Sequence, residues 1–266
     1  MRKRHLESLF AGPDGPVRFP RVTALVGAGG KTTLMYALAD RMVAAGRRAV
    51  CTTTTRIFPP DAGVPLILLE GESDPVGAVR AALAAASRIV VALRLLPDVG
   101  KLEGLLPETV DALADALPEA CFLVEADGAA RKPLKAPAAH EPVFPRRLDC
   151  CVAVVGLDGV GQPLDDAHVH RAALVCAVAG REPGDPVTSG TLARLVEHPE
   201  GLFRGCPPCR RLVFANKADR PGVLASAAEA AALSPSVRWF AGSAAQGWCV
   251  PLAEEGPADA WHPALT

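Results

Sequence analysis

Short apolar runs that are typical of strands alternate with helix-like patterns along most of this chain. The first pair is an apolar run at 22–26 and a pattern at 32–45 that places Leu34, Leu38 and Met42 on one face of a helix. In such alternation the strands lie parallel, and the helices that connect them cover the faces of the sheet. The sequence therefore predicts an α/β fold with a mainly parallel sheet and helices on both faces.

The same patterns repeat through the rest of the chain. Further strands are predicted at 48–53, 66–69, 89–93, 121–125, 151–155, 212–215 and 237–240. Further helices are predicted at 76–86, 108–117, 169–178 and 223–233, with one more that begins after Thr188 or Ser189. We expect residues 21–250 to form one nucleotide-binding domain with room for a small lobe within 130–210, residues 1–20 an N-terminal extension, and residues 251–266 a C-terminal tail.

Composition limits the classes of partner and compartment. The formal net charge is −1 and the pI is about 6.6, so no overall field attracts nucleic acid or an anionic membrane. The basic cluster Arg2-Lys3-Arg4 is read as part of a solvated tail. No apolar run is long enough for a transmembrane helix, and no secretory signal is recognisable. We therefore expect a cytoplasmic protein whose eight cysteines are thiols.

A glycine-rich segment follows the first predicted strand and opens the first predicted helix. It consists of Gly27, Ala28, Gly29, Gly30, Lys31, Thr32 and Thr33. Phosphates need closely approaching backbone N–H groups, which glycines permit, and a helix N-terminus adds further donors. Lys31 would reach the β and γ phosphates, and the Thr32 hydroxyl would bind Mg²⁺. The segment predicts a P-loop and a P-loop NTPase-like fold, against the alternative of a glycine-rich turn with an incidental lysine.

Asn216-Lys217-Ala218-Asp219 follows the apolar run at 212–215. Asn-Lys-x-Asp at a strand end is the guanine-reading pattern of GTPases, in which the carboxylate accepts hydrogen bonds from N1–H and the N2 amine of guanine. Ser243 closes the next predicted strand and would lie beside the base. These residues favour GTP over ATP, whereas on their own they could form a polar turn with a helix cap.

Two carboxylates end the apolar run at 121–124. Glu125 and Asp127 are two residues apart and therefore lie on the same side of an extended chain. We expect Asp127 to hold Mg²⁺ together with Thr32, and Glu125 to orient the attacking water, so that Lys31, Glu125 and Asp127 form the catalytic set. The alternative is that both carboxylates cap a strand end. The Asp-x-x-Gly pattern of switch GTPases is absent at this position.

Several further polar residues would meet a second, anionic ligand. Thr54 and Arg56 lie at the carboxyl end of a predicted strand, where ligands bind in such folds. Arg131, Lys132 and Lys135 occupy a proline-stiffened loop directly after Asp127, and His140 follows. Solvated surface charge is the alternative for this set.

Cys206-Pro207-Pro208-Cys209 is a single CxxC motif without a second pair at zinc-site spacing. It is either a thiol pair without function or a site of sulfur, selenium or redox chemistry.

The combination of motifs resembles the YqeC family over residues 20–245. The segments that carry the resemblance are 26–33, 52–60, 124–137, His140-Glu141-Pro142, 155–159 with His168 and His170, and 216–219. Members of this family are accessory proteins of selenium-dependent molybdenum hydroxylases, implicated in producing or inserting the labile selenium cofactor. The resemblance implies a nucleotide-dependent maturation factor whose partners are a molybdenum hydroxylase client and selenophosphate or a molybdopterin-type cofactor.

The predicted function is binding and hydrolysis of a nucleoside triphosphate in that maturation. Two other functions fit the same motifs: a small-molecule kinase or ligase that uses the P-loop, and a non-catalytic, nucleotide-gated chaperone for a molybdoenzyme.

Overall fold

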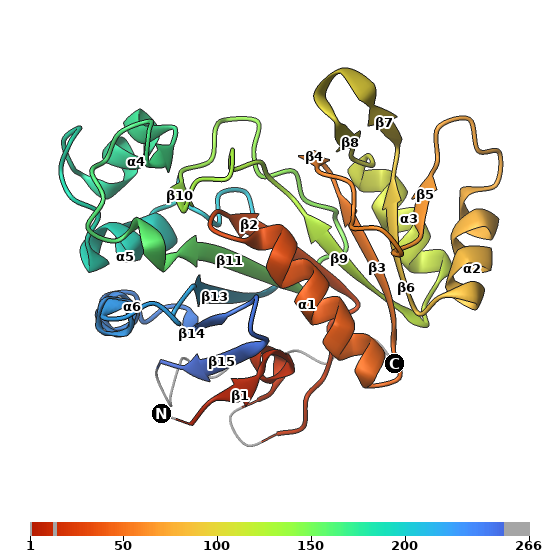
Figure 1. The fold of residues 1–266 in the computed structure, drawn as a ribbon, viewed down its shortest axis with the longest axis horizontal. Coiled ribbons are helices and arrows are strands. Elements are labelled where there is room, and N and C mark those ends of the chain that lie inside the picture. The colour runs from red at the N-terminus through yellow and green to blue at the C-terminus, as the bar shows by residue number, and fades with distance from the viewer. Residues whose placement is uncertain (1, 13–14, 253–266) are drawn as a thin grey trace.

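The structure is a computed structural model that describes residues 2–12 and 15–252. In this described part the central sheet has ten strands (Figure 1). In spatial order they are β1 (Arg4–His5), β15 (Trp248–Pro251), β14 (Arg238–Ser243), β13 (Arg210–Asn216), β11 (Cys150–Gly156), β2 (Val22–Gly27), β9 (Ala120–Glu125), β3 (Arg48–Thr53), β6 (Arg88–Ala92) and β5 (Leu66–Leu68). Every pair from β14 to β5 is parallel, and β15 and β1 add an antiparallel edge.

Helices cover both faces of this sheet, as the sequence predicts. The helix α1 (Lys31–Ala44) and the 3-10 helix η1 (Leu6–Phe10) pack on one face, and α1 crosses the front of the sheet in Figure 1. The other face packs against α2 (Pro75–Ala85), α3 (Pro107–Ala116), α5 (Ser189–Glu197) and α6 (Val223–Leu233), while α4 (Ala172–Ala179) lies against α5.

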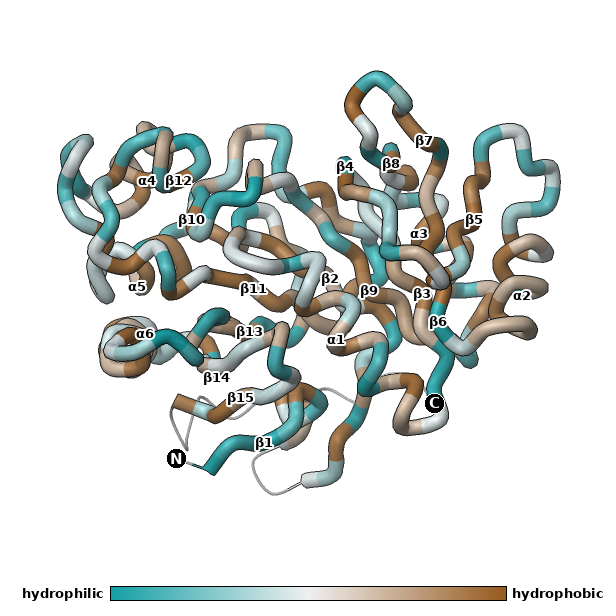
Figure 2. Tube along the Cα trace, viewed as in Figure 1, coloured by the Kyte–Doolittle hydropathy of each residue, from teal (hydrophilic) through white to brown (hydrophobic). Residues whose placement is uncertain are grey.

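The strands supply apolar side chains to both layers. Ala24 and Val26 of β2 join the core beneath α2–α6, whereas Leu25 between them joins the core beneath α1. This is the period of two that a strand buried on both faces requires. Figure 2 shows the inner strands as largely hydrophobic and many of the connecting loops as hydrophilic.

Two small sheets and two short helices complete the described fold. They are β10 (Leu134–Lys135) with β12 (Val169–His170), the antiparallel set β4 (Arg56–Ile57), β8 (Lys101–Glu103) and β7 (Arg94–Leu96), and the 3-10 helices η2 (Pro97–Val99) and η3 (Leu157–Gly159). These strands are only two or three residues long, too short for an alternating pattern to reveal them.

Two of the predicted elements are corrected. The predicted helix at 169–178 begins at Ala172, because Val169 and His170 pair with β10 and Arg171 has a φ of 61° that breaks the helix. The strand predicted at 237–240 is not the last one, because β15, which the sequence did not predict, follows it and pairs with it in the antiparallel direction.

The N-terminal segment is not a solvated tail. Arg4 and His5 pair with β15, and Leu6, Leu9 and Phe10 are each at most 1% exposed in the core beneath α1. Of the predicted C-terminal tail, residues 253–266 lie outside the described residues. Within the described part, none of the helices has the length and apolar character needed to cross a bilayer.

Candidate functional site

The polar residues singled out in the sequence gather at the carboxyl ends of four neighbouring strands. β9, β2, β11 and β13 are adjacent and parallel, and they end at Glu125, Gly27, Gly156 and Asn216. The chain passes from β9, on one side of β2, to β11, on the other side of β2. The direction in which successive strands are added to the sheet therefore reverses at β2. Open α/β sheets bind their ligands in the crevice at such a point.

The glycine-rich loop between β2 and α1 packs tightly against the neighbouring strands. The Ala28 N–H donates to the Val154 carbonyl at 2.9 Å. A Cβ on Gly29 would lie 2.4 Å from the backbone of Gly156, and one on Gly30 would lie 2.4 Å from Nδ2 of Asn216. Both glycines also have positive φ values, 89° and 121°, so both the space and the conformation require glycine.

The N-terminus of α1 opens onto this loop without a side-chain cap. Gly30 is the N-cap residue and supplies no capping hydrogen bond. The first N–H groups of a helix have no partner within the helix and carry a partial positive charge. The start of α1 therefore offers the donors that an anion would need.

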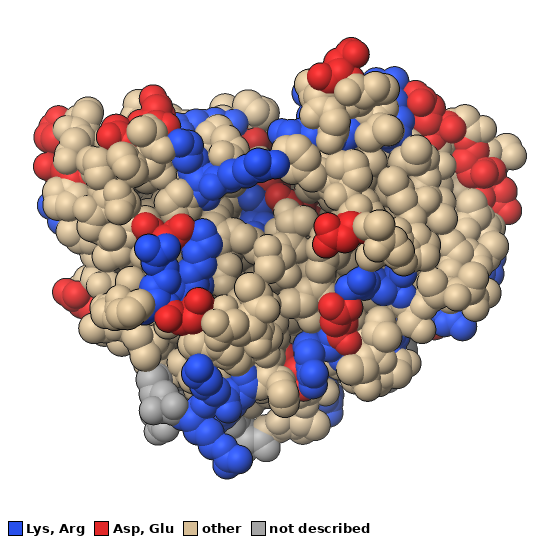
Figure 3. Space-filling view, in the orientation of Figure 1, with Lys and Arg blue, Asp and Glu red and all other residues tan. Residues whose placement is uncertain are grey.

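A cavity of about 520 Å³ lies over the loop. Its lining includes Gly29, Gly30, Thr32, Thr33 and six basic residues, Lys31, Arg56, Lys101, Arg131, Lys132 and Lys217, with Glu125 as an acidic member. Figure 3 shows basic side chains beside the hollow in the upper middle of the molecule. An excess of basic over acidic side chains in a concave site favours a polyanionic ligand.

One side of the cavity combines aromatic and basic groups. Phe58 is 43% exposed, and its ring lies under the Lys101 Nζ at 5.0 Å and the Arg131 guanidinium at 4.4 Å. Both distances are within the range of cation–π contacts. Lys101 belongs to β8 in the small sheet that the sequence does not predict, so neither it nor Phe58 was recognised from the sequence.

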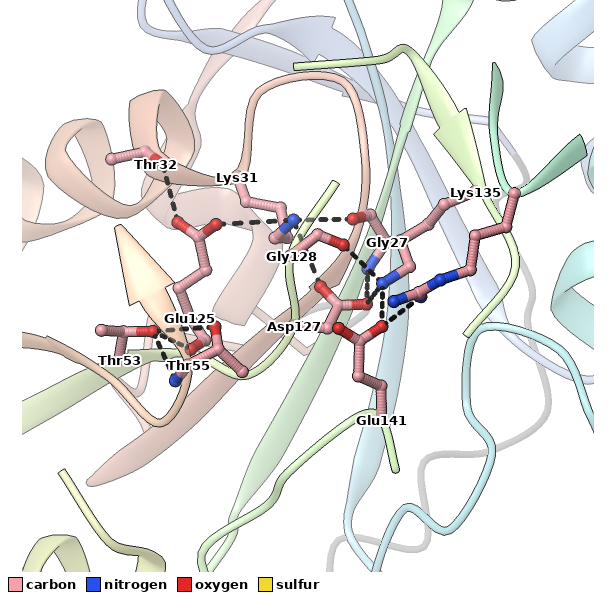
Figure 4. A network of polar contacts seen from close by, with 11 residues as sticks. Gly27, Lys31, Thr32, Thr53, Thr55, Glu125, Asp127, Gly128, Lys135 and Glu141 are labelled. Atoms are coloured by element: carbon pink, nitrogen blue, oxygen red, sulfur yellow. Dashed lines mark hydrogen bonds and ion pairs between the residues drawn. The ribbon is translucent and has the colours of Figure 1, made fainter. Parts of the chain in front are cut away.

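Lys31 is buried beneath the loop, only 4% exposed (Figure 4). Its ammonium donates to the Gly27 carbonyl at 2.7 Å and lies 3.2 Å from Asp127 and 3.5 Å from Glu125. Burial by itself would lower the pKa of Lys31, but Asp127 and Glu125 outweigh it, and the pKa is raised. The lysine is thus charged and held at the base of the glycine-rich loop.

Glu125 connects this lysine to the cavity. The Thr32 hydroxyl donates to one of its oxygens at 2.6 Å, and the other oxygen faces Lys31. Burial raises the pKa of Glu125, and Lys31 and Thr32 only partly offset the effect. A carboxylate beside a threonine hydroxyl at the edge of a polyanion site fits Mg²⁺, which in such sites is held by one or two carboxylates with phosphate and water.

Asp127 has a different position from the one predicted. It is 1% exposed and is not part of the cavity lining. One oxygen accepts from the Gly27 N–H at 3.0 Å and pairs with Lys135 at 3.0 Å, and the other faces Lys31. Glu125 therefore reaches the cavity, whereas both oxygens of Asp127 face groups beneath the loop.

Beyond Asp127 the ion pairs continue into the second half of the chain (Figure 4). Lys135 is fully buried and contacts Glu141 at 2.7 Å, and Arg171 reaches the same Glu141 oxygen at 2.5 Å. Burial would raise the pKa of Glu141, but Arg171 and Lys135 prevail and lower it to about 2. Lys135, which was predicted to meet a second anionic ligand, is thus a buried, ion-paired cation outside the cavity lining.

The other residues predicted for the second ligand divide into two groups. Arg56, Arg131 and Lys132 line the cavity. Thr54 donates its hydroxyl to the Val143 carbonyl at 2.6 Å, and His140 is exposed; neither belongs to the lining. Glu141 and Arg171, which the sequence did not single out as site residues, connect the network to α4.

The residues predicted to read guanine lie at the ends of β13 and β14. Asn216 is buried; its amide donates to the Gly29 carbonyl at 2.8 Å and accepts from the Ala244 N–H at 2.9 Å. Asn216 therefore joins the glycine-rich loop to the loop after β14, next to the buried Ser243. Lys217 lines the cavity and pairs with Asp158 at 2.6 Å, and Asp219 is exposed.

Comparisons with known proteins place the chain in a family. The model of the YqeC protein family matches residues 23–173, which include the glycine-rich loop, Glu125, Asp127, Glu141 and Arg171. The chain is 37% identical over 205 residues to "Uncharacterized protein YqeC" of Escherichia coli (strain K12), covering 76% of this chain and 78% of that protein. No solved structure matches. The chain therefore belongs to the YqeC family.

Proposed function

We propose that this protein binds a nucleoside triphosphate with Mg²⁺ at the P-loop and hydrolyses it, with GTP as the preferred nucleotide. The observation that carries the proposal is the uncapped N-terminus of α1 beneath a cavity lined by six basic side chains. The phosphates would accept hydrogen bonds from the backbone N–H groups of residues 29–32, which line the cavity.

The side chains around the loop would each have a separate role in binding the γ-phosphate and the metal. Lys31 would exchange one of its carboxylate contacts for the γ-phosphate, as its position 3.5 Å from Glu125 permits. Thr32 and Glu125 would hold the metal and its water. Asp127 and Lys135 would fix the loop from below without contacting the nucleotide, because both are buried away from the cavity.

The guanine preference rests on Asp219 and Asn216. Asn216 ties the phosphate loop to the loop after β14 and so fixes the end of β13, where Asp219 is exposed. A carboxylate there would accept two hydrogen bonds from guanine, which adenine does not offer. We expect GTP to bind at least about tenfold more tightly than ATP, a difference of about 1.4 kcal/mol.

Nucleotide titrations of the wild type and of Asp219→Ala in the presence of Mg²⁺ test this preference. The variant should bind both nucleotides equally. Glu119→Ala is a matched control, since Glu119 is an exposed acid just before β9, at the opposite end of the sheet. Equal or tighter binding of ATP by the wild type would refute the guanine assignment, and no binding of either nucleotide would refute the P-loop assignment.

We further propose that the hydrolysis serves the maturation of a selenium-dependent molybdenum hydroxylase, as the resemblance of the motifs implies. The cavity supports a second anionic ligand, selenophosphate or a molybdopterin-type cofactor, because Lys101 and Arg131 flank Phe58 in addition to the cations beside the P-loop. The additional basic residues Lys101 and Arg131 also favour the alternative function of a kinase or ligase. The protein would be incubated with GTP and selenophosphate, and the products would be analysed. A phosphorylated acceptor in place of free phosphate would support the kinase function.

A further inference from the structure

A second cluster of reactive groups lies far from the P-loop. Cys206 and Cys209 precede β13, and Cys151 is the second residue of β11. These positions are at the amino ends of the two strands, whereas the P-loop packs against the carboxyl ends. Cys151 and Gly156 are five residues apart on β11, roughly 16 Å at the rise of a strand. The thiols therefore form a site separate from the proposed nucleotide cavity.

The geometry brings the two thiols of the CxxC motif together. The Sγ atoms of Cys206 and Cys209 are 3.6 Å apart, which is within hydrogen-bonding distance for sulfur. Pro207 and Pro208 restrict the backbone between the two cysteines, which reduces the entropy lost when the thiols meet. Side-chain rotation can close the remaining gap to the length of a disulfide, about 2.05 Å.

The pair also differs from the other cysteines in accessibility. Cys51, Cys121, Cys150, Cys151, Cys176 and Cys249 are buried, whereas Cys206 and Cys209 are partly exposed. All eight cysteines of the chain lie within the described residues, and none forms a disulfide there. A soluble oxidant can thus reach the CxxC pair before the remaining thiols.

The surroundings distinguish the two thiols. Hydrogen bonds from Cys151 and Cys209, together with the Arg211 guanidinium, lower the pKa of Cys206. The hydrogen bond to Cys206 and burial raise the pKa of Cys209. Arg211 is held in place by its hydrogen bond to the Cys206 carbonyl at 3.1 Å. One thiol is therefore suited to attack and the other to resolve the product.

We propose that Cys206 and Cys209 are a redox-active dithiol that exchanges with low-molecular-weight disulfides. The Cys206 thiolate attacks one sulfur of an external disulfide RSSR, breaks its S–S bond and releases RS⁻. Cys209 then loses its proton and attacks Cys206 Sγ, which releases the second RS⁻ and forms the Cys206–Cys209 disulfide. The external disulfide is reduced to two thiolates, and one proton is released in the exchange.

Peptide mass spectrometry of the full chain in glutathione redox buffers tests the proposal. Trypsin cleaves after Arg204 and Arg210, so both cysteines fall on the single peptide 205–210. In glutathione disulfide this peptide should lose two hydrogens and escape alkylation, and reduced glutathione should reverse the change. Cys176→Ser, which removes a buried thiol of α4, should behave as the wild type. Complete alkylation of both thiols in every buffer would overturn the proposal.

Single variants test the division of roles. Cys209→Ser should stop at the mixed disulfide between Cys206 and glutathione. Cys206→Ser should react at Cys209 more slowly than Cys209→Ser reacts at Cys206, because burial still raises the pKa of the Cys209 thiol in this variant. Arg211→Ala should shift the pH profile of the Cys209→Ser reaction upwards while its circular dichroism stays unchanged. Equal rates for the two cysteine variants, or an unshifted profile, would contradict the assignment of Cys206 as the attacking thiol.

Discussion

At the scale of single residues, the two carboxylates that follow the same strand have different environments. Glu125 lines the cavity and accepts a hydrogen bond from Thr32, whereas Asp127 lies beneath the glycine-rich loop between Lys31 and Lys135. Their separation of two residues put them on one side of the chain but did not reveal which would reach the ligand.

We predict that Glu125→Gln lowers GTP turnover by roughly a hundredfold while the free energy of unfolding changes little. Asp127→Asn should instead destabilise the fold by about 3 kcal/mol, because it removes one of the two carboxylates that neutralise each of the buried lysines, Lys31 and Lys135. Steady-state hydrolysis and urea denaturation of both variants measure the contrast. A hundredfold loss of turnover in Asp127→Asn at unchanged stability would reverse the two assignments.

At the scale of elements, ion pairs connect the glycine-rich loop region to segments that follow β9. Asp127 contacts Lys135 of β10, and Glu141 joins Lys135 to Arg171 just before α4. β10 also pairs with β12, so side-chain and backbone contacts hold the same segments together.

We predict that Glu141→Gln destabilises the protein by about 2 kcal/mol at pH 7. The pKa of Glu141 is lowered from 4.5 to about 2, so its contribution is complete above about pH 4.5 and is lost as the pH falls toward 2. Urea denaturation at a series of pH values should show the wild type and the variant converging over this range. Glu119→Gln, at an exposed position, serves as the control. A difference that stays constant from pH 7 to pH 3 would show that Glu141 acts by packing alone.

At the scale of the whole molecule, the N-terminal segment completes the core on the face of α1. η1 inserts three apolar side chains beneath α1, and β1 covers the antiparallel edge that β15 would otherwise expose. Covered edges protect a sheet from pairing with other chains.

We predict that Phe10→Ala lowers the free energy of unfolding by about 3–5 kcal/mol, the usual cost of removing a buried aromatic side chain. Phe58→Ala should cost no more than about 0.5 kcal/mol, because Phe58 is 43% exposed. Chemical denaturation of the two variants compares a core phenylalanine with one at the cavity. Equal stabilities would mean that the N-terminal segment does not contribute to the core.

The sequence by itself determined the features that depend on neighbouring residues. The strand and helix patterns placed the inner strands within one to three residues, and the glycine-rich turn between β2 and α1 lies where the motif predicted it. Periodicity and turn chemistry are properties of short segments, so a single sequence contains them. The same locality explains why the α/β class could be predicted and why the short strands of the two small sheets could not.

Only the tertiary structure decided which polar groups face the cavity and which lie beneath it. Lys135 looked like a solvated cation, but Asp127 and Glu141 come from other segments to neutralise it in the interior. Lys101 and Phe58 joined the cavity through the small sheet, and residues 4–10 joined the core through β15 and α1. Each of these outcomes depends on contacts between residues far apart in the chain, because burial and charge pairing are set by the fold as a whole.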